Sequence, residues 1–165
     1  MSSEVKIMVV NVEKEKDDQF ICGMANFTVY TCDNIFRELL AAVPGIKCGV
    51  AMNEAAPRLV RVNGNDERLK ELAAKNALAI GASHAYVILM KEAFPINVLN
   101  ALKNVPGICN VIVATANPVQ LIIAETPLGR AILGAVDGNS VTNIENEEQR
   151  KERRELVRKL GYILG

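Results

Sequence analysis

The chain has 165 residues, half of them hydrophobic and only 4% aromatic, so its length suits a single domain with an aliphatic core. Its 19 basic and 19 acidic residues cancel, which argues against a general attraction to nucleic acid or to an anionic membrane. No run approaches the ~20 apolar residues of a membrane span, and the first residues lack a signal-peptide pattern, so we expect a cytoplasmic protein.

Short apolar runs typical of strands recur along the chain. They lie at Lys6–Val12, Ile46–Met52, Leu59–Asn63, His84–Met90, Cys109–Thr115, Val119–Glu125 and Arg130–Val136, with a weaker one at Phe20–Phe27. We expect a strand at each of these positions.

Helical patterns separate these strands. Asp33 can cap a first helix, and Asn65 or Asp66 can cap a second helix that ends at Gly81. Pro95 suits the first turn of a third helix.

A last, highly charged helix is predicted near the C-terminus. Thr142 and Glu145 have the spacing of a capping box. Only Leu156, Val157 and Leu160 form an apolar stripe on this helix. We therefore expect most of it to be solvated or packed on a partner.

A short sequence repeat indicates the architecture. Val43–Ile46 reads VPGI and recurs as Val105–Ile108, and a helical pattern precedes both copies. The order of elements is then β-α-β-β-α, followed by a second such unit with one additional strand. We predict a single α/β domain with a mixed sheet made from this duplicated unit and with helices packed on the sheet.

The familiar signatures of metal, redox and nucleotide chemistry are absent. The cysteines Cys22, Cys32, Cys48 and Cys109 have no metal-binding spacing, and we expect them to be reduced and structural. The chain has no phosphate-binding glycine loop, no kinase signature and no zinc cluster. Asp and Glu side chains could bind Mg²⁺, but no spacing demands it, so no metal site and no cofactor are assigned.

Right-handed crossovers between parallel strands would sort the polar residues onto two edges of the sheet. One edge would carry His84, Asp66 and Glu125, and the opposite edge would carry Asn53, Glu54, Asn117 and Asp137. A site that uses both groups would then have to form between subunits.

His84 is the only histidine and stands where a turn enters a buried strand. Imidazole can accept a phosphoryl group or act as an acid and base near neutral pH. A hydrogen-bonded histidine at a strand edge is the structural alternative. The sequence offers no Ser or Cys nucleophile in a pattern that would indicate a hydrolase triad with His84.

The other polar candidates each have a structural alternative as well. Asn53 and Glu54 in one hairpin, and Asn117 in the matching hairpin, can bind ribose hydroxyls or a base edge, but such residues also simply form turns. Asp137, followed by glycine, has the same two interpretations. Arg130 suits phosphate or carboxylate recognition, or a salt bridge to Glu125.

Long motifs of this chain resemble those of the adenosine-specific kinase family. They are Val43–Lys47, Leu59–Arg61, Gly64–Glu67, Gly81–His84 and the whole of Ala93–Gly138. We predict a domain like that of this family over residues 1–143. The charged helix at residues 144–165 would be part of the same domain or an oligomer contact.

The resemblance implies a compact α/β protein that forms a homotrimer or a hexamer. It also implies binding of adenosine and AMP rather than ADP or ATP, and a phosphorylatable histidine, which falls on His84. The resulting hypothesis is a phosphotransferase acting on adenosine, with neither nucleic acid nor membrane as a partner. The alternative is a non-catalytic adenosine/AMP sensor or binding module.

Roles follow from that hypothesis. Glu54, Asn117 and Asp137 would line the adenosine pocket, with Asn53 and Glu125 as further substrate-binding residues. His84 would carry the phosphoryl group to the ribose 5′-hydroxyl, and Asp137 would orient that hydroxyl. Arg130 would offset the charge on the transferring oxygens.

Overall fold

The computed structural model describes residues 4–26 and 31–161. Within these residues, one antiparallel sheet has the order β1-β7-β8 and a second has the order β4-β3-β5-β2-β6. The strands are β1 (Lys6–Asn11), β2 (Gln19–Met24), β3 (Lys47–Asn53), β4 (Val60–Gly64), β5 (Ala85–Lys91), β6 (Val113–Thr115), β7 (Val119–Glu125) and β8 (Arg130–Asp137). The helices are α1 (Thr31–Ala42), α2 (Glu67–Ile80), α3 (Pro95–Lys103) and α4 (Glu147–Lys159).

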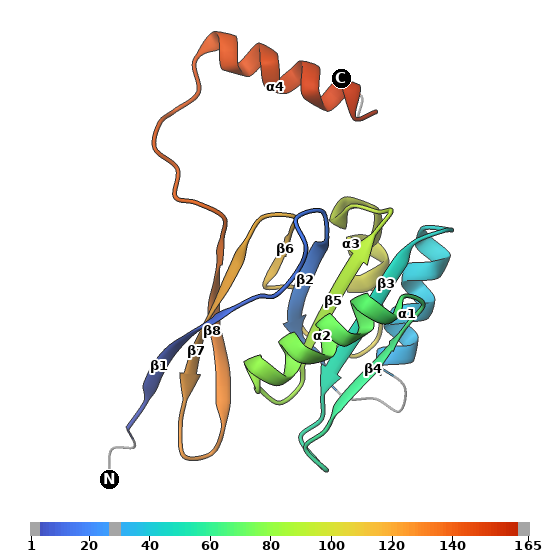
Figure 1. The fold of residues 1–165 in the computed structure, drawn as a ribbon, viewed down its shortest axis with the longest axis vertical. Helices are drawn as coiled ribbons and strands as arrows, with labels where there is room; N and C mark the ends of the chain where they lie inside the picture. Colours follow the sequence, from blue (N-terminus) through green and yellow to red (C-terminus); the bar gives the residue numbers. More distant parts are fainter. Residues whose placement is uncertain (1–3, 27–30, 162–165) are drawn as a thin grey trace.

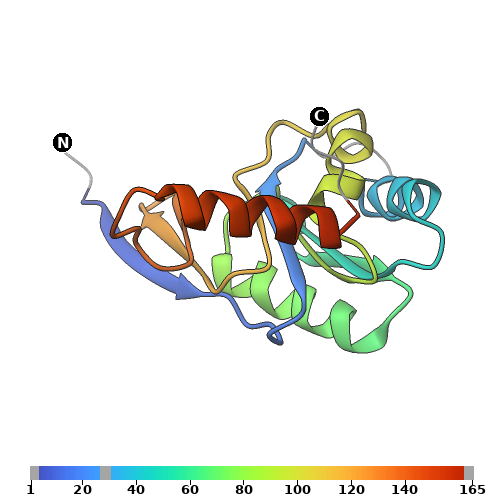
Figure 2. The same ribbon diagram turned by 90° about the horizontal axis from the view of Figure 1, so that it is seen from above.

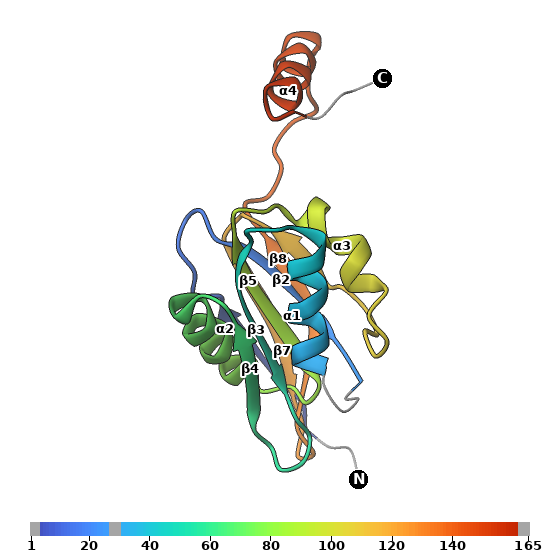
Figure 3. The ribbon, with the colours of Figure 1, turned by 90° about the vertical axis from the view of Figure 1, so that its right-hand side faces the viewer.

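The five-stranded sheet lies between two layers (Figures 1 and 3). Side chains alternate across it, since Phe20 and Val87 belong to one core while Ile21 and Ile88 belong to the other. The first core is closed by α2 and the three-stranded sheet, and the second by α1 and α3. Both faces of the central sheet are therefore buried.

The predicted single α/β domain is confirmed, but its strands form two antiparallel sheets rather than one mixed sheet. The crossover through α1 joins β2 to β3, and β5 lies between these two strands and pairs antiparallel with both. β1 leaves the central sheet and pairs with β7. Strands joined by a parallel crossover are thus not neighbours, which the linear order of elements could not reveal.

The repeated VPGI segments form the same local turn. The Ile46 N–H donates to the Val43 carbonyl at 3.1 Å, and the Ile108 N–H donates to the Val105 carbonyl at 3.1 Å. The turns follow α1 and α3 and lead toward β3 and β6. Beyond them the halves differ, because β4 pairs with β3 whereas β7 pairs with β1 and β8.

The helix ends follow the capping chemistry of the sequence with two differences. Asp66 accepts a hydrogen bond from the Leu69 N–H at 3.0 Å and caps α2. Asp33 is not a cap but lies in the first turn of α1. The last helix is capped by Asn146 rather than by Thr142: the Asn146 side chain accepts from the Gln149 N–H, and the Asn146 N–H donates to the Gln149 side chain.

The last helix stands apart from the rest of the domain (Figures 1 and 3), and a view from above shows it lying across the domain (Figure 2). Residues 139–146 lead to it without regular structure, and none of the residues of α4 is buried. Within residues 4–26 and 31–161, the helices are too short or too polar to cross a bilayer. Phe27, the predicted end of the weak strand, lies outside the described residues.

Three of the four cysteines are buried, and all four are free. Burial raises the pKa of the Cys22, Cys32 and Cys48 thiols to about 12. Because the thiolate is the reactive form, these side chains are inert near neutral pH, in agreement with a structural role.

Candidate functional site

Asn53 and His84 lie side by side, where β3 ends and β5 begins. The His84 N–H donates to the main-chain carbonyl of Asn53 at 2.9 Å. Right-handed crossovers between neighbouring strands predict these two residues on opposite edges of the sheet. That prediction is wrong because β3 and β5 are antiparallel neighbours, so the end of one meets the start of the other.

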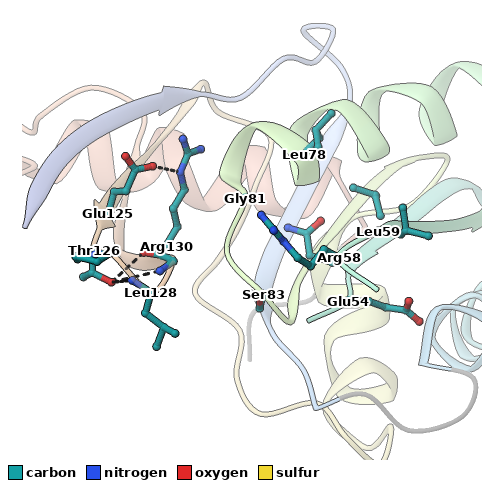
Figure 4. A pocket seen from close by; sticks show the side chains of 14 residues that line it. Glu54, Arg58, Leu59, Leu78, Gly81, Ser83, Glu125, Thr126, Leu128 and Arg130 are labelled. Carbon is teal, nitrogen blue, oxygen red and sulfur yellow. Dashed lines mark hydrogen bonds and ion pairs between the residues drawn. The ribbon is translucent and has the colours of Figure 1, made fainter. Parts of the chain in front are cut away.

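A pocket of about 470 Å³ opens at this end of the sheet (Figure 4). It lies between the loop that joins β3 to β4, the C-terminus of α2 and the turn of the β7–β8 hairpin. The residues that line it are Asn53, Glu54, Arg58, Leu59, Val60, Leu78, Gly81, Ser83, Glu125, Thr126, Pro127, Leu128, Gly129 and Arg130. This volume is within the range of small-ligand sites.

The Asn53 side chain is held in one orientation at the pocket wall. Its Nδ2 donates to the main-chain carbonyls of Ala77 at 2.8 Å and Ala82 at 2.9 Å. Both partners are acceptors, so the amide nitrogen must face them and the carbonyl oxygen is left over. Asn53 is only 8% exposed, and its Oδ1 has no hydrogen-bond partner among the described residues. An acceptor left in this state is costly unless a ligand or water satisfies it.

Glu54, the next residue, is also buried. Nη2 of Arg61 lies 2.8 Å from its Oε2, an ion-pair contact. The contact lacks the alignment of a hydrogen bond, so this oxygen has no hydrogen-bond partner in the described part of the chain. Figure 4 shows the Glu54 carboxylate turned away from Ser83 and Gly81. Glu54 thus borders the pocket with its charge already partly balanced.

Arg130 and Glu125 bring the β7–β8 hairpin to the pocket. The Nε of Arg130 donates to Glu125 Oε2 at 2.6 Å, and its Nη1 donates to the Ala79 carbonyl at 3.2 Å, in the last turn of α2. The predicted salt bridge therefore forms, and the same pair lines the pocket. The two interpretations of Arg130 do not exclude one another.

Arg58 was not identified from the sequence. It is exposed, adopts φ +69° and makes no ion pair with the residues that the structure describes. In Figure 4 its guanidinium extends toward Gly81. Arginine in an exposed loop is ordinary, and only the position of that loop beside the C-terminus of α2 distinguishes Arg58.

His84 is fixed by its backbone rather than by its ring. Its φ is +64°, and its carbonyl accepts a hydrogen bond from the Ala25 N–H at 2.9 Å. The half-buried imidazole makes no hydrogen bond or ion pair with the described residues. The preceding residue, Ser83, lines the pocket, whereas His84 is not among the described residues that line it.

Asn117 and Asp137 lie at the other end of the β7–β8 hairpin. Asn117 Nδ2 donates to Asp137 Oδ1 at 3.0 Å on the exposed surface. The length of β7 separates this pair from Glu125 by about 20 Å. One chain therefore brings Asn53, Glu54, Glu125 and Arg130 together but leaves Asn117 and Asp137 elsewhere.

A second polar cluster lies at this opposite end of the molecule, around Asp18. The Asp18 side chain is fully buried and accepts hydrogen bonds from Arg68 at 2.8 and 2.9 Å and from the Glu15 N–H at 2.9 Å. Lys91 lies 3.7 Å away. Burial alone would raise the pKa of Asp18, but these partners outweigh it and lower that pKa below 3.8.

The described residues contain no evident metal-binding cluster. Within residues 4–26 and 31–161, no three or more His, Cys, Asp or Glu side chains are grouped so that they could hold a metal ion.

The structure is thus that of an α/β protein with a polar pocket of small-ligand size at one end of its central sheet. The family model described as adenosine specific kinase matches residues 10–163, so the chain belongs to the adenosine-specific kinase family. This confirms the resemblance found in the sequence, and the matched region includes α4. No curated protein matches the chain.

The fold is shared with a solved structure, the crystal structure of the PH1918 protein from Pyrococcus horikoshii OT3. The two chains are 54% identical, with a TM-score of 0.94, over 98% of this chain and 100% of that chain.

Proposed function

We propose that the protein binds adenosine and AMP in the pocket beside Asn53 and is a phosphotransferase that acts on adenosine through a phosphohistidine at His84. Membership of the adenosine-specific kinase family supports the substrate class. The observation that carries the location is the buried, unpaired Oδ1 of Asn53 in a pocket that also contains two arginines. Ribose hydroxyls or the adenine amine can donate to this oxygen.

The transfer would proceed in two displacements. A nitrogen of His84 attacks the terminal phosphorus of a phosphoanhydride donor, the bond to the bridging oxygen breaks, and the rest of the donor leaves with that oxygen. The ribose 5′-hydroxyl then attacks the phosphohistidine and releases the imidazole. The proton of the hydroxyl passes to a carboxylate of the site. Glu125 lines the pocket, whereas Asp137 could serve only from a neighbouring subunit, since it lies at the far end of the same chain.

A homotrimer or hexamer is part of the proposal. α4 buries none of its residues, and Leu156 is 57% and Leu160 54% exposed, so this helix offers an apolar contact to another copy. Sedimentation at micromolar concentration should give a multiple of the 17.9 kDa chain. A monomer alone would rule out any role for Asp137 at the pocket.

The alternative is an adenosine/AMP-binding module without catalysis. It is favoured by one observation, that His84 does not line the pocket among the described residues. Binding would then depend on Asn53 and its neighbours, and the histidine would be a strand-edge residue.

Two measurements on the wild type and on His84→Ala separate these functions. Calorimetry with adenosine, AMP, ADP and ATP tests binding, and intact mass before and after incubation with a phosphoanhydride tests the phosphohistidine. We expect an added phosphoryl group in the wild type and none in the variant, with adenosine affinity retained in both. Lys103→Ala, on the exposed end of α3, is the control.

Each outcome has one meaning. An unmodified wild type that binds adenosine supports the non-catalytic module. Loss of adenosine binding in His84→Ala assigns the histidine to the ligand or the fold instead of to phosphoryl transfer. A wild type that binds neither adenosine nor AMP removes both functions.

A further inference from the structure

We infer that Arg58 recognises the anionic phosphate of a nucleoside monophosphate in this pocket, and that Arg130 does not. The inference rests on the proposed function and deepens it by giving the phosphate a partner and the ligand an orientation.

The charges around the pocket balance except at Arg58. Glu54 is paired with Arg61 at 2.8 Å, and Glu125 is paired with Arg130 at 2.6 Å. Arg130 also donates to the Ala79 carbonyl at the end of α2. Among the described residues that line the pocket, Arg58 is thus the cation without a carboxylate partner. A guanidinium in this state suits the bidentate recognition of phosphate.

The backbone places Arg58 at the mouth of the pocket. The Glu54 N–H donates to the Leu59 carbonyl at 2.9 Å and closes the loop that carries Arg58. The side chain extends toward Gly81 (Figure 4). Arg58 is exposed whereas Asn53 is only 8% exposed, so the cation lies at the solvent side and the amide at the wall.

The Oδ1 of Asn53 and the guanidinium of Arg58 can bind different parts of one ligand. Phosphate at neutral pH offers acceptors, which the Oδ1 of Asn53 cannot use, whereas hydroxyl and amine groups offer donors. A ligand that satisfies both must carry donors at one end and an anion at the other. A nucleoside monophosphate meets this requirement, with its sugar or base against Asn53 and its phosphate toward Arg58.

The experiment compares Arg58→Gln with the double variant Glu125→Gln/Arg130→Gln, which removes the paired charges together. Arg37→Gln, on the exposed surface of α1, is the control. Calorimetry is run with AMP, adenosine and ribose 5-phosphate, and thermal melts establish that each variant folds.

We expect Arg58→Gln to weaken AMP by about tenfold to a hundredfold, as for the loss of a charge-assisted hydrogen bond. Adenosine should change by less than about twofold, since it carries no phosphate. The double variant should weaken AMP by less than Arg58→Gln does, because it leaves the net charge of the pocket unchanged. Salt should weaken AMP binding in the wild type more than in Arg58→Gln.

Failure of this inference and failure of the proposed function are distinguishable. If Arg58→Gln binds AMP as Arg37→Gln does, or if the double variant loses as much as Arg58→Gln, the inference is overturned while adenosine binding still supports the nucleoside site. If the wild type binds neither nucleoside, the proposed function falls. Ribose 5-phosphate then decides: binding that requires Arg58 retains the anion site, and absence of binding removes it.

Discussion

The two ends of the five-stranded sheet differ in how completely their buried polar side chains are hydrogen bonded. At one end Asp18 is fully buried, and both of its carboxylate oxygens accept hydrogen bonds from Arg68. At the other end Asn53 and Glu54 are each 8% exposed, and each has an oxygen that lacks a hydrogen-bond partner among the described residues. The same sheet therefore ends in a completed polar network on one side and an incomplete one on the other.

The difference separates structure from function. A buried polar group that lacks a partner costs free energy, so a fold keeps one only where something else supplies the partner. The Asp18 cluster needs nothing further and is a structural element. The Asn53 end is open to a pocket of about 470 Å³ and is where a ligand would complete the network.

Arg68→Ala should give the largest effect, and on stability alone. It removes the two hydrogen bonds that Arg68 donates to the buried carboxylate of Asp18, and leaves it the Glu15 N–H at 2.9 Å and Lys91 at 3.7 Å as partial compensation. We expect the free energy of unfolding to fall by about 3 kcal/mol, measured by urea denaturation. Adenosine affinity of the folded fraction should stay at the wild-type value. A loss below about 1 kcal/mol would mean that this cluster is not what holds its end of the sheet.

Asn53→Ala should lower both stability and binding. It removes two hydrogen bonds from a buried side chain, and we expect a loss of about 2 kcal/mol in the free energy of unfolding. Adenosine affinity should fall about tenfold in the same protein. The matched control is Asn117→Ala, whose single exposed hydrogen bond should be worth less than about 0.5 kcal/mol. Equal binding by the two variants would remove Asn53 from the site.

Substitution of two glycines with similar backbone angles tests the two ends of the β7–β8 hairpin, since Gly81 lies beside Arg130 at one end and Gly138 beside Asn117 at the other. Gly81 has φ +67° and a Cβ there would lie 3.1 Å from Arg130, whereas Gly138 has φ +71° and a Cβ would lie 3.2 Å from Asn117. Alanine at either position should cost about 1 kcal/mol of stability because of the left-handed backbone. Only Gly81→Ala should also weaken AMP, because the added methyl group would lie in the pocket beside the guanidinium of Arg58. If Gly138→Ala weakens AMP as well, both hairpin ends belong to the site.

The sequence predicted what depends on local chemistry. Asp66 and Gly81 mark the ends of the second helix, and each predicted strand pattern overlaps a strand of the described structure. The VPGI turns form as a pair because a proline and a glycine in succession specify that turn. These features need only neighbouring residues, and the family was likewise carried by contiguous motifs.

What failed depended on the order of strands in space. The prediction assumed that strands joined by a crossover pair with each other, and it therefore placed Asn53 and His84 far apart. In the structure the main chains of these two residues are hydrogen bonded. The sequence did not indicate Arg58, because the position of its loop beside the end of α2 is a tertiary contact that the local pattern does not reveal. Asn53 Nδ2 donates to two main-chain carbonyls, and a contact of this kind cannot be predicted from a pattern of side chains.

The pH dependence of stability should show the smallest effect, since burial opposes the partners of Asp18 in setting its pKa. That pKa is lowered in the folded protein below its ordinary value of 3.8. The folded state therefore holds its proton less tightly than the unfolded chain, so the stabilisation is complete above pH 3.8 and is lost as the pH falls through the lower, folded pKa. Urea denaturation of the wild type and of Asp18→Asn at pH 7 and in steps below pH 4 tests the sign. The difference in free energy of unfolding between the two proteins should shrink on acidification. A difference that stays constant or widens would show that the carboxylate is not stabilised by its charge, and the contrast between the two ends would then rest on hydrogen bonds alone.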